Sequence, residues 1–176
     1  MKLKWITDTF GIITTTELAL GVYSQDRKVG LLFDSGYHHE SSQLLELLEK
    51  EGLRIDLVVN THNHLDHVGA NLVLRHHHAS KIMMPRYEAM QIESLSGLKS
   101  LYYNVPPERI KERFGYMIQI PDDYIEKGQK SFFWKGKEFQ ILHNRGHSLQ
   151  HCSYKTPDGY WYLGDMLITK KTRNTA

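Results

Sequence analysis

Residues 61–67, Thr-His-Asn-His-Leu-Asp-His, place four side chains that can bind a metal ion within a stretch of six residues: His62, His64, Asp66 and His67. His62 and His64 are two positions apart, which puts them on opposite sides of a helix but on one side of an extended chain. We therefore expect a loop or strand end that leads into a helix near Asp66. Imidazole nitrogen and carboxylate oxygen are the ligands of catalytic zinc, whose sites keep one coordination position open for water.

Two other interpretations fit this stretch less well. The His-Glu-x-x-His pattern of zinc proteases needs ligands four apart on a helix, and this spacing does not match it. A solvated loop that happens to be rich in histidine would give no reason for the ligands to converge. The spacing therefore favours a catalytic metal site.

Two further candidate ligands each follow a predicted strand. His147 lies in Gly-His-Ser at 146–148, after a strand predicted at 138–143, and Asp165 follows a strand predicted at 160–163. Taken singly, each is a weak signal. Loops at one edge of a sheet can converge although they are far apart in sequence, so we expect both to join the first cluster.

The elements that must position these residues alternate between strand and helix. Residues 11–33 predict a β-hairpin with a polar break at 24–27, and a helix is expected from Ser41 to Gly52. A buried strand at 55–60 leads into the candidate ligands, and a helix at 68–78 and a strand at 81–84 follow them. This order predicts a mixed α/β (α+β) fold, with a sheet covered by helices.

The second half of the chain predicts a helical segment and then more strands. Residues 86–131 are expected to form a helical insert between the ligand segments, acting either as a lid over a substrate pocket or as a packed surface helix pair. A hairpin turning at Gly136 is predicted at 132–143, with further strands at 152–155 and 160–163.

Composition narrows the classes of function. The chain has 176 residues, 22 Lys and Arg against 20 Asp and Glu, and one cysteine, Cys152. We expect one domain over 1–176, no membrane-spanning helix, no signal peptide and a reducing, cytoplasmic location. The densest basic stretch, Lys170–Arg173, is short, so nucleic-acid binding by charge is disfavoured.

The motifs at 61–67 (THNHLDH), 146–148 (GHS) and 163–165 (LGD), with the acidic turn at 33–36, resemble the metallo-β-lactamase superfamily in its glyoxalase-II-like branch. The resemblance runs from about Gly11 to Asp165. It implies an αβ/βα four-layer sandwich, with the metal site at one edge of two face-to-face sheets.

The resemblance also implies a ligand set for two divalent metal ions, zinc first, with iron or manganese as alternatives. A first metal would be held by His62, His64 and His147. A second would be held by Asp66 and His67, with Asp165 bridging the two ions and a shared hydroxide as nucleophile.

Three side chains have supporting roles in this expectation. Asp66 would also act in catalysis, by orienting the nucleophile and receiving its proton. Thr61 and Asp34 would hold the imidazole rings in orientation by hydrogen bonding. His143 and His151 flank His147; each is a candidate for the same supporting role, and neither matches a ligand position in the family.

The function implied is hydrolysis of a small ester, thioester or lactone. The alternatives are a phosphodiesterase or nuclease of the same fold, and a metal-binding inactive fragment. We expect a small-molecule substrate and leave a homodimer open. No histidine follows Asp165, although this branch supplies one more to the second metal, and the closing strands and outer helix are missing. We therefore expect a domain that is incomplete at its C-terminus.

Overall fold

A seven-stranded sheet forms the larger half of the protein. The computed structural model describes residues 1–144 and 146–166, so the basic stretch Lys170–Arg173 lies outside the described residues. The strands lie in chain order across the sheet: β1 (Lys2–Trp5), β2 (Phe10–Thr14), β3 (Ala19–Tyr23), β4 (Val29–Phe33), β5 (Arg54–Val59), β6 (Lys81–Pro85) and β7 (Asp123–Ile125).

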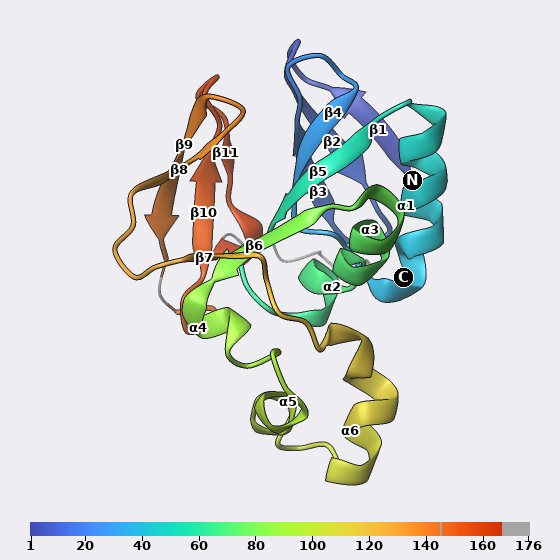
Figure 1. The fold of residues 1–176 in the computed structure, drawn as a ribbon, viewed down its shortest axis with the longest axis vertical. Helices are drawn as coiled ribbons and strands as arrows, with labels where there is room; N and C mark the ends of the chain where they lie inside the picture. The colour runs from blue at the N-terminus through green and yellow to red at the C-terminus, as the bar shows by residue number, and fades with distance from the viewer. Residues whose placement is uncertain (145, 167–176) are drawn as a thin grey trace, which may run out of the picture.

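Strands β1 to β4 pair antiparallel, and β4 to β7 pair parallel. The helices α1 (Ser41–Lys50) and α3 (Asn71–His78) provide the crossovers and cover one face of the sheet (Figure 1). Leu44, Leu48 and Leu74 on these helices are buried against that face. Parallel pairing brings the carboxyl ends of β4, β5 and β6 to the same edge of the sheet.

A four-stranded antiparallel sheet packs against the other face of the first sheet (Figure 1). It is formed by β8 (Ser131–Trp134), β9 (Lys137–His143), β10 (Cys152–Lys155) and β11 (Trp161–Tyr162). The core between the sheets is largely aromatic. The ring of Phe33 on β4 stacks with Tyr154 at 5.5 Å and with Tyr162 at 5.3 Å between centroids.

The described residues form three of the four expected layers: helices, first sheet and second sheet. None of the described residues forms a helix over the outer face of the second sheet (Figure 1). That face exposes Phe133 (69%), Leu142 (43%) and Trp161 (42%). The described part of the chain has no helix that is both long and apolar enough to cross a membrane.

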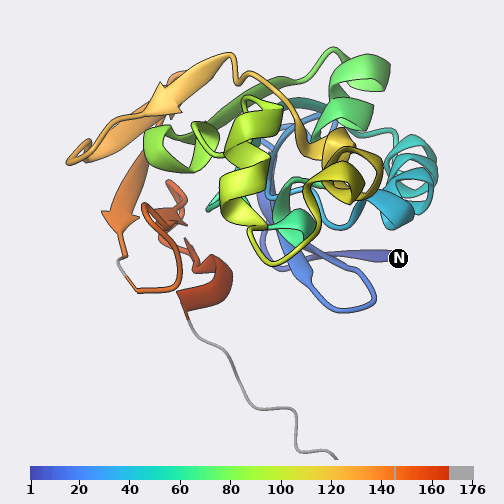
Figure 2. The same cartoon turned by 90° about the horizontal axis from the view of Figure 1, so that it is seen from below.

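The segment between β6 and β8 only partly matches the predicted insert at 86–131. It is helical as far as Met117, but Asp123–Ile125 forms β7, the edge strand of the first sheet. Its helices are α4 (Arg86–Ala89), α5 (Leu95–Leu101), α6 (Pro107–Phe114) and the short η2 (Gly115–Met117). They pack around an apolar cluster that also includes Val68 on α2 and Met84 on β6. Figure 2 shows these helices from below.

Two predicted elements in the first half differ from the structure. The predicted hairpin at 11–33 consists of three strands, β2 to β4, because a second turn lies between Thr15 and Leu18. The strand β1, which precedes them, is absent from the prediction. The helix predicted at 68–78 is divided into α2 (Leu65–Val68) and α3, with Gly69 between them. α3 ends at His78, whose Nδ1 accepts a hydrogen bond from Ile55 N at 3.0 Å, while His76 and His77 are exposed.

Gly69 keeps helical φ and ψ of −60° and −36°, and it lies against the backbone of the loop after β4. A Cβ placed there would lie 2.2 Å from His38 N and 2.6 Å from Gly36 O. We expect Gly69→Ala to reduce the free energy of unfolding by about 1–3 kcal/mol, because backbone atoms cannot yield as a flexible side chain does. Urea unfolding measures this.

Gly115→Ala is the matched control for this prediction. Gly115 has a helical φ of −58°, and a Cβ there would come no closer than 3.8 Å to another atom, on Lys111. Alanine there is expected to be neutral or slightly stabilising. Equal effects of the two substitutions would contradict the close contact at Gly69.

Candidate metal centre

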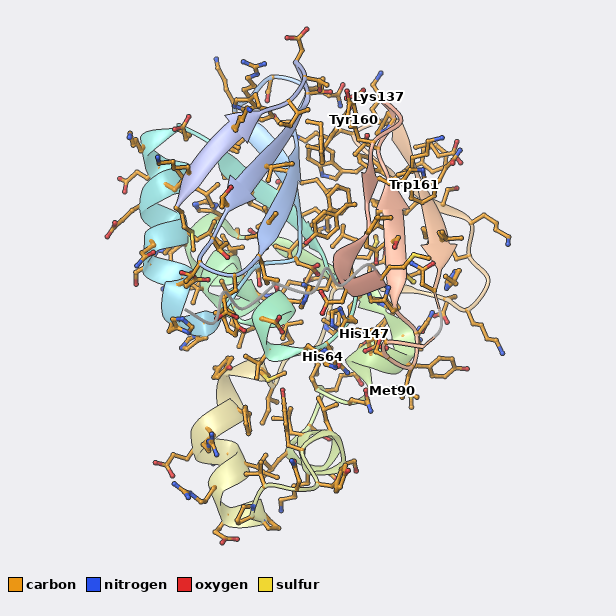
Figure 3. The ribbon with its side chains drawn as sticks, turned by 180° about the vertical axis from the view of Figure 1, so that it is seen from behind. His64, Met90, Lys137, His147, Tyr160 and Trp161 are labelled. Atoms are coloured by element: carbon orange, nitrogen blue, oxygen red, sulfur yellow. The ribbon has the colours of Figure 1, made fainter. Side chains whose placement is uncertain are left out.

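The candidate ligands lie at the carboxyl edge of the parallel strands. β5 ends at Val59 and leads into the loop that carries His62 and His64, and the adjacent β4 ends just before Asp34. His147 comes from the loop between β9 and β10, and Asp165 from the turn after β11. In Figure 3, His64 and His147 lie together where the two sheets meet the helical segment.

The first group contains His62, His64, His147 and Asp165, as one set of ligand atoms within 4.8 Å of one another. His147 Nε2 lies 3.1 Å from His62 Nε2 and 3.1 Å from His64 Nδ1. It lies 3.3 Å from Asp165 Oδ2. Two nitrogen ligands on a tetrahedral zinc ion are about 3.3–3.4 Å apart, because each Zn–N bond is about 2.0–2.1 Å long. The donor set and its spacing therefore fit a zinc ion.

Hydrogen bonds explain why His62 presents Nε2 to this group. Its Nδ1 lies 2.9 Å from Thr61 Oγ1, and that hydroxyl lies 2.9 Å from Asp34 Oδ2. Since the carboxylate can only accept, the Thr61 hydroxyl donates to Asp34, and His62 Nδ1–H donates to Thr61. This assignment of the proton leaves a lone pair on Nε2. Burial, followed by the neighbouring histidines, lowers the pKa of His62, so the ring is neutral.

The second group contains Asp66, His67 and Asp165. His67 Nε2 lies 3.5 Å from Asp66 Oδ2 and 3.2 Å from Asp165 Oδ1. Asp165 therefore presents one oxygen to each group, with Oδ1 toward His67 and Oδ2 toward His147. This is the arrangement that a bridging carboxylate requires. All six predicted ligands are thus brought into two groups that share one residue.

His67 is oriented by the same carboxylate that supports His62. Its Nδ1 lies 2.8 Å from Asp34 Oδ2, and both side chains are buried. Burial lowers the pKa of His67, but the charge of Asp34 and hydrogen bonds to Asp165, Asp34 and Asp66 outweigh it and raise the pKa well above its usual value. The carboxylates around the His67 ring thus stabilise a positive charge at this position, and they would stabilise a bound metal cation in the same way.

Two residues outside the predicted ligand set also contact this centre, and only Tyr162 was missed from the sequence. Tyr162 OH donates to Asp34 Oδ2 at 3.0 Å, which ties the second sheet to the loop after β4. His151 is buried, and its Nε2 accepts a hydrogen bond from Asp165 N at 3.2 Å. Burial lowers the pKa of His151 to about 4, so the ring is neutral at neutral pH and can accept this bond.

A cavity of about 410 Å³ opens beside the centre. Among its lining residues are His147, His151 and Asp165, together with Asn144. Its volume falls in the usual range of pockets that bind a small molecule.

A sequence profile of the metallo-beta-lactamase superfamily matches residues 22–175. The chain belongs to the metallo-beta-lactamase superfamily. Hydroxyacylglutathione hydrolase GloC of Haemophilus influenzae is 27% identical over 132 residues, covering 73% of this chain and 56% of that protein. Hydroxyacylglutathione hydrolase of Maricaulis maris is 26% identical over 131 residues, covering 73% of this chain and 40% of that protein. The chain thus spans about half the length of these relatives.

Solved structures of metallo-beta-lactamases share the fold of this superfamily member. The B3 metallo-beta-lactamase BLEG-1 aligns with a TM-score of 0.70 and 22% identity, over 91% of this chain and 73% of that chain. A variant metallo-beta-lactamase of Cronobacter sakazakii aligns with a TM-score of 0.73 and 20% identity, over 92% of this chain and 62% of that chain. The predicted fold class and the glyoxalase-II-like resemblance are confirmed, for a domain of partial length.

Binding of zinc is expected to stabilise the folded chain, because the ligands converge only after folding. At a free Zn²⁺ concentration one hundred times the Kd, each occupied site adds about 2.7 kcal/mol to the free energy of unfolding. The thermal unfolding midpoint of the metal-free protein should rise when Zn²⁺ is added, and it should fall back to its original value when EDTA removes the metal. Mg²⁺ is the control, since it prefers oxygen ligands. An equal shift with Mg²⁺ would argue against an imidazole-rich site.

Proposed function

We propose that this chain is the metal-binding part of a hydrolase that cleaves a small ester, thioester or lactone. The observation that carries the proposal is the pair of ligand groups joined by Asp165, whose two oxygens face His147 and His67 at 3.3 Å and 3.2 Å. Two divalent cations held there, zinc by preference, would lower the pKa of a water molecule and polarise a scissile carbonyl oxygen.

The side chains around the centre suit this reaction. Hydrogen bonds and the charge of His67 outweigh burial and lower the pKa of Asp66, so its carboxylate is ionised and can accept a proton from the attacking water. Asp34 holds His67 and, through Thr61, His62 in fixed orientations. The cavity beside His147 has room for a small acyl substrate.

The substrate class is supported by the relatives and by charge. Two of the curated relatives carry the name hydroxyacylglutathione hydrolase, which favours an acyl bond. The near balance of 22 basic and 20 acidic residues favours a small molecule over nucleic acid. A cytoplasmic location remains a prediction based on the single cysteine.

Metal content measured beside turnover tests the proposal. The purified chain is assayed with an acyl-glutathione thioester, a lactone and bis(p-nitrophenyl) phosphate, and its metals are quantified by mass spectrometry. We expect two metals per chain and turnover of the thioester or lactone. Turnover of the phosphodiester alone would replace this proposal with a phosphodiesterase. One metal and no turnover would support an inactive metal-binding fragment.

A further inference from the structure

A buried carboxylate outside the two ligand groups links the loops that carry the candidate ligands. Glu88 lies on α4, the first helix of the segment between β6 and β8, and its side chain is fully buried. It is not a member of either ligand group. A buried carboxylate is costly unless its oxygens accept hydrogen bonds, so its partners indicate what it does.

Among the described residues, the donors to the Glu88 carboxylate come from the two ligand loops. Asn63, which lies between His62 and His64, donates its backbone N–H to Oε2 at 3.3 Å. Ser148, the residue after His147, donates its hydroxyl to Oε1 at 2.8 Å.

Further hydrogen bonds, most of them with a backbone group, connect α4 and the residues just after it to the same loops. Gln150 N donates to Glu88 Oε1 at 2.6 Å. Asn63 Nδ2 donates to the Glu88 carbonyl oxygen at 2.9 Å and to Gln91 Oε1 at 2.7 Å. Tyr87 N donates to Gln150 Oε1 at 2.9 Å. One short helix therefore holds both ligand loops, which are 85 positions apart at Asn63 and Ser148 (148 − 63).

These contacts engage both carboxylate oxygens of Glu88 within the protein. Both oxygens accept hydrogen bonds, and neither is among the unpartnered buried atoms of the described residues. A role limited to filling space would not require a charged group with three donors directed at it. Hydrogen bonds to a carboxylate are short and strong, and here they fix the distance between the two loops.

We propose that Glu88 is a positioning residue for the first metal group, holding His62 and His64 at the correct distance from His147. The inference deepens the proposed function, since it concerns the same centre. It requires only that the centre binds a divalent metal, so it does not depend on which substrate is cleaved. It also makes α4 part of the metal centre rather than of a detachable lid.

Cobalt binding by the full chain tests this role without an activity assay. Glu88→Gln keeps the shape of the side chain but directs an amide N–H₂ at groups that themselves donate. We expect the Co²⁺ affinity, measured by competition with a chromogenic chelator, to fall by about 10–100-fold. The visible absorption of bound Co²⁺ should change as well, because the ligand geometry changes. Circular dichroism reports whether the variant folds.

Glu93→Gln is the matched control. Glu93 lies in the same segment and accepts a hydrogen bond from Tyr124 OH at 2.7 Å, away from both ligand groups. Its substitution should leave Co²⁺ affinity and spectrum unchanged. Ser148→Ala is the second variant if Glu88→Gln does not fold; it removes one donor, and we expect a weaker loss in the same direction.

Wild-type Co²⁺ affinity and spectrum in a folded Glu88→Gln variant would overturn the inference. The same result in Ser148→Ala would overturn it if the first variant does not fold. The outcome is separate from that of the proposed function. A chain that turns over no substrate can still lose Co²⁺ affinity on Glu88→Gln, and an active chain can fail to do so.

Discussion

Asp66→Ala is expected to reduce hydrolysis by about 10²–10⁴-fold, the usual contribution of a general acid–base group, while the chain still folds. Asp66 is one of three ligand candidates in the second group and the proposed acceptor of the proton from water. Its side chain is partly exposed, at 22%, and its ionic contact is with His67 at 3.5 Å. Its loss should therefore affect chemistry and metal content more than stability.

Turnover of the thioester or lactone, metal content and thermal unfolding measure this effect together. Asp8→Ala provides the control, since Asp8 is fully exposed and its contact with Arg27 is a surface ion pair at 3.6 Å. It should leave turnover and metal content unchanged. If Asp66→Ala kept more than a tenth of the wild-type turnover, Asp66 would not be the proton acceptor.

Asp34→Ala should produce the largest loss of stability of any change at the centre. The buried carboxylate of Asp34 accepts from Thr61 N at 2.8 Å, Thr61 Oγ1 at 2.9 Å, His67 Nδ1 at 2.8 Å and Tyr162 OH at 3.0 Å. Its removal leaves these groups buried without their acceptor. We expect the free energy of unfolding to fall by about 3–5 kcal/mol, as when one partner of a buried charged pair is removed.

Urea unfolding of the metal-free protein measures this loss without a contribution from metal binding. Asp34→Asn is expected to lose less, because asparagine accepts the positive φ of 59° at this position and keeps one acceptor oxygen. Asp26→Ala removes an exposed carboxylate that also accepts backbone hydrogen bonds, and should have a much smaller effect. A loss below about 1 kcal/mol for Asp34→Ala would show that the donors find other partners.

Short-range spacing explains why much of the centre was predictable. The separation of His62 and His64 already required an extended loop, and the structure places that loop at the end of β5. His147 and Asp165 could be proposed because each follows a strand. Residues that act only through tertiary contacts have no characteristic spacing in the sequence from which their role can be predicted. Glu88 is 22 positions from Asp66 (88 − 66) on a helix with no motif of its own, so its role became visible only from its partners.

The errors in predicted elements have the same physical origin. A continuous helix at 68–78 satisfied the periodicity, but the backbone departs from helical geometry at Ala70, with a ψ of 5°, and α3 begins separately at Asn71. β1 escaped prediction although Lys2–Trp5 alternates polar and apolar residues, because four residues are a short signal and the strand depends on pairing with β2. Residues 123–125 look like a loop on their own and become a strand only beside β6.

The hydrogen bond from Tyr162 to Asp34 joins residues 128 positions apart, which has a consequence for the order of folding. Contacts of such separation form late, since a long loop must close before they can stabilise the chain. At about 5–20 residues per second, a ribosome needs roughly 5–20 s to pass from His67 to Asp165. Until His147 is made, a nascent chain can offer a metal ion only the ligands of the loop after β5. Full loading of the centre is therefore expected only after Asp165 has been made and the second sheet has packed against the first.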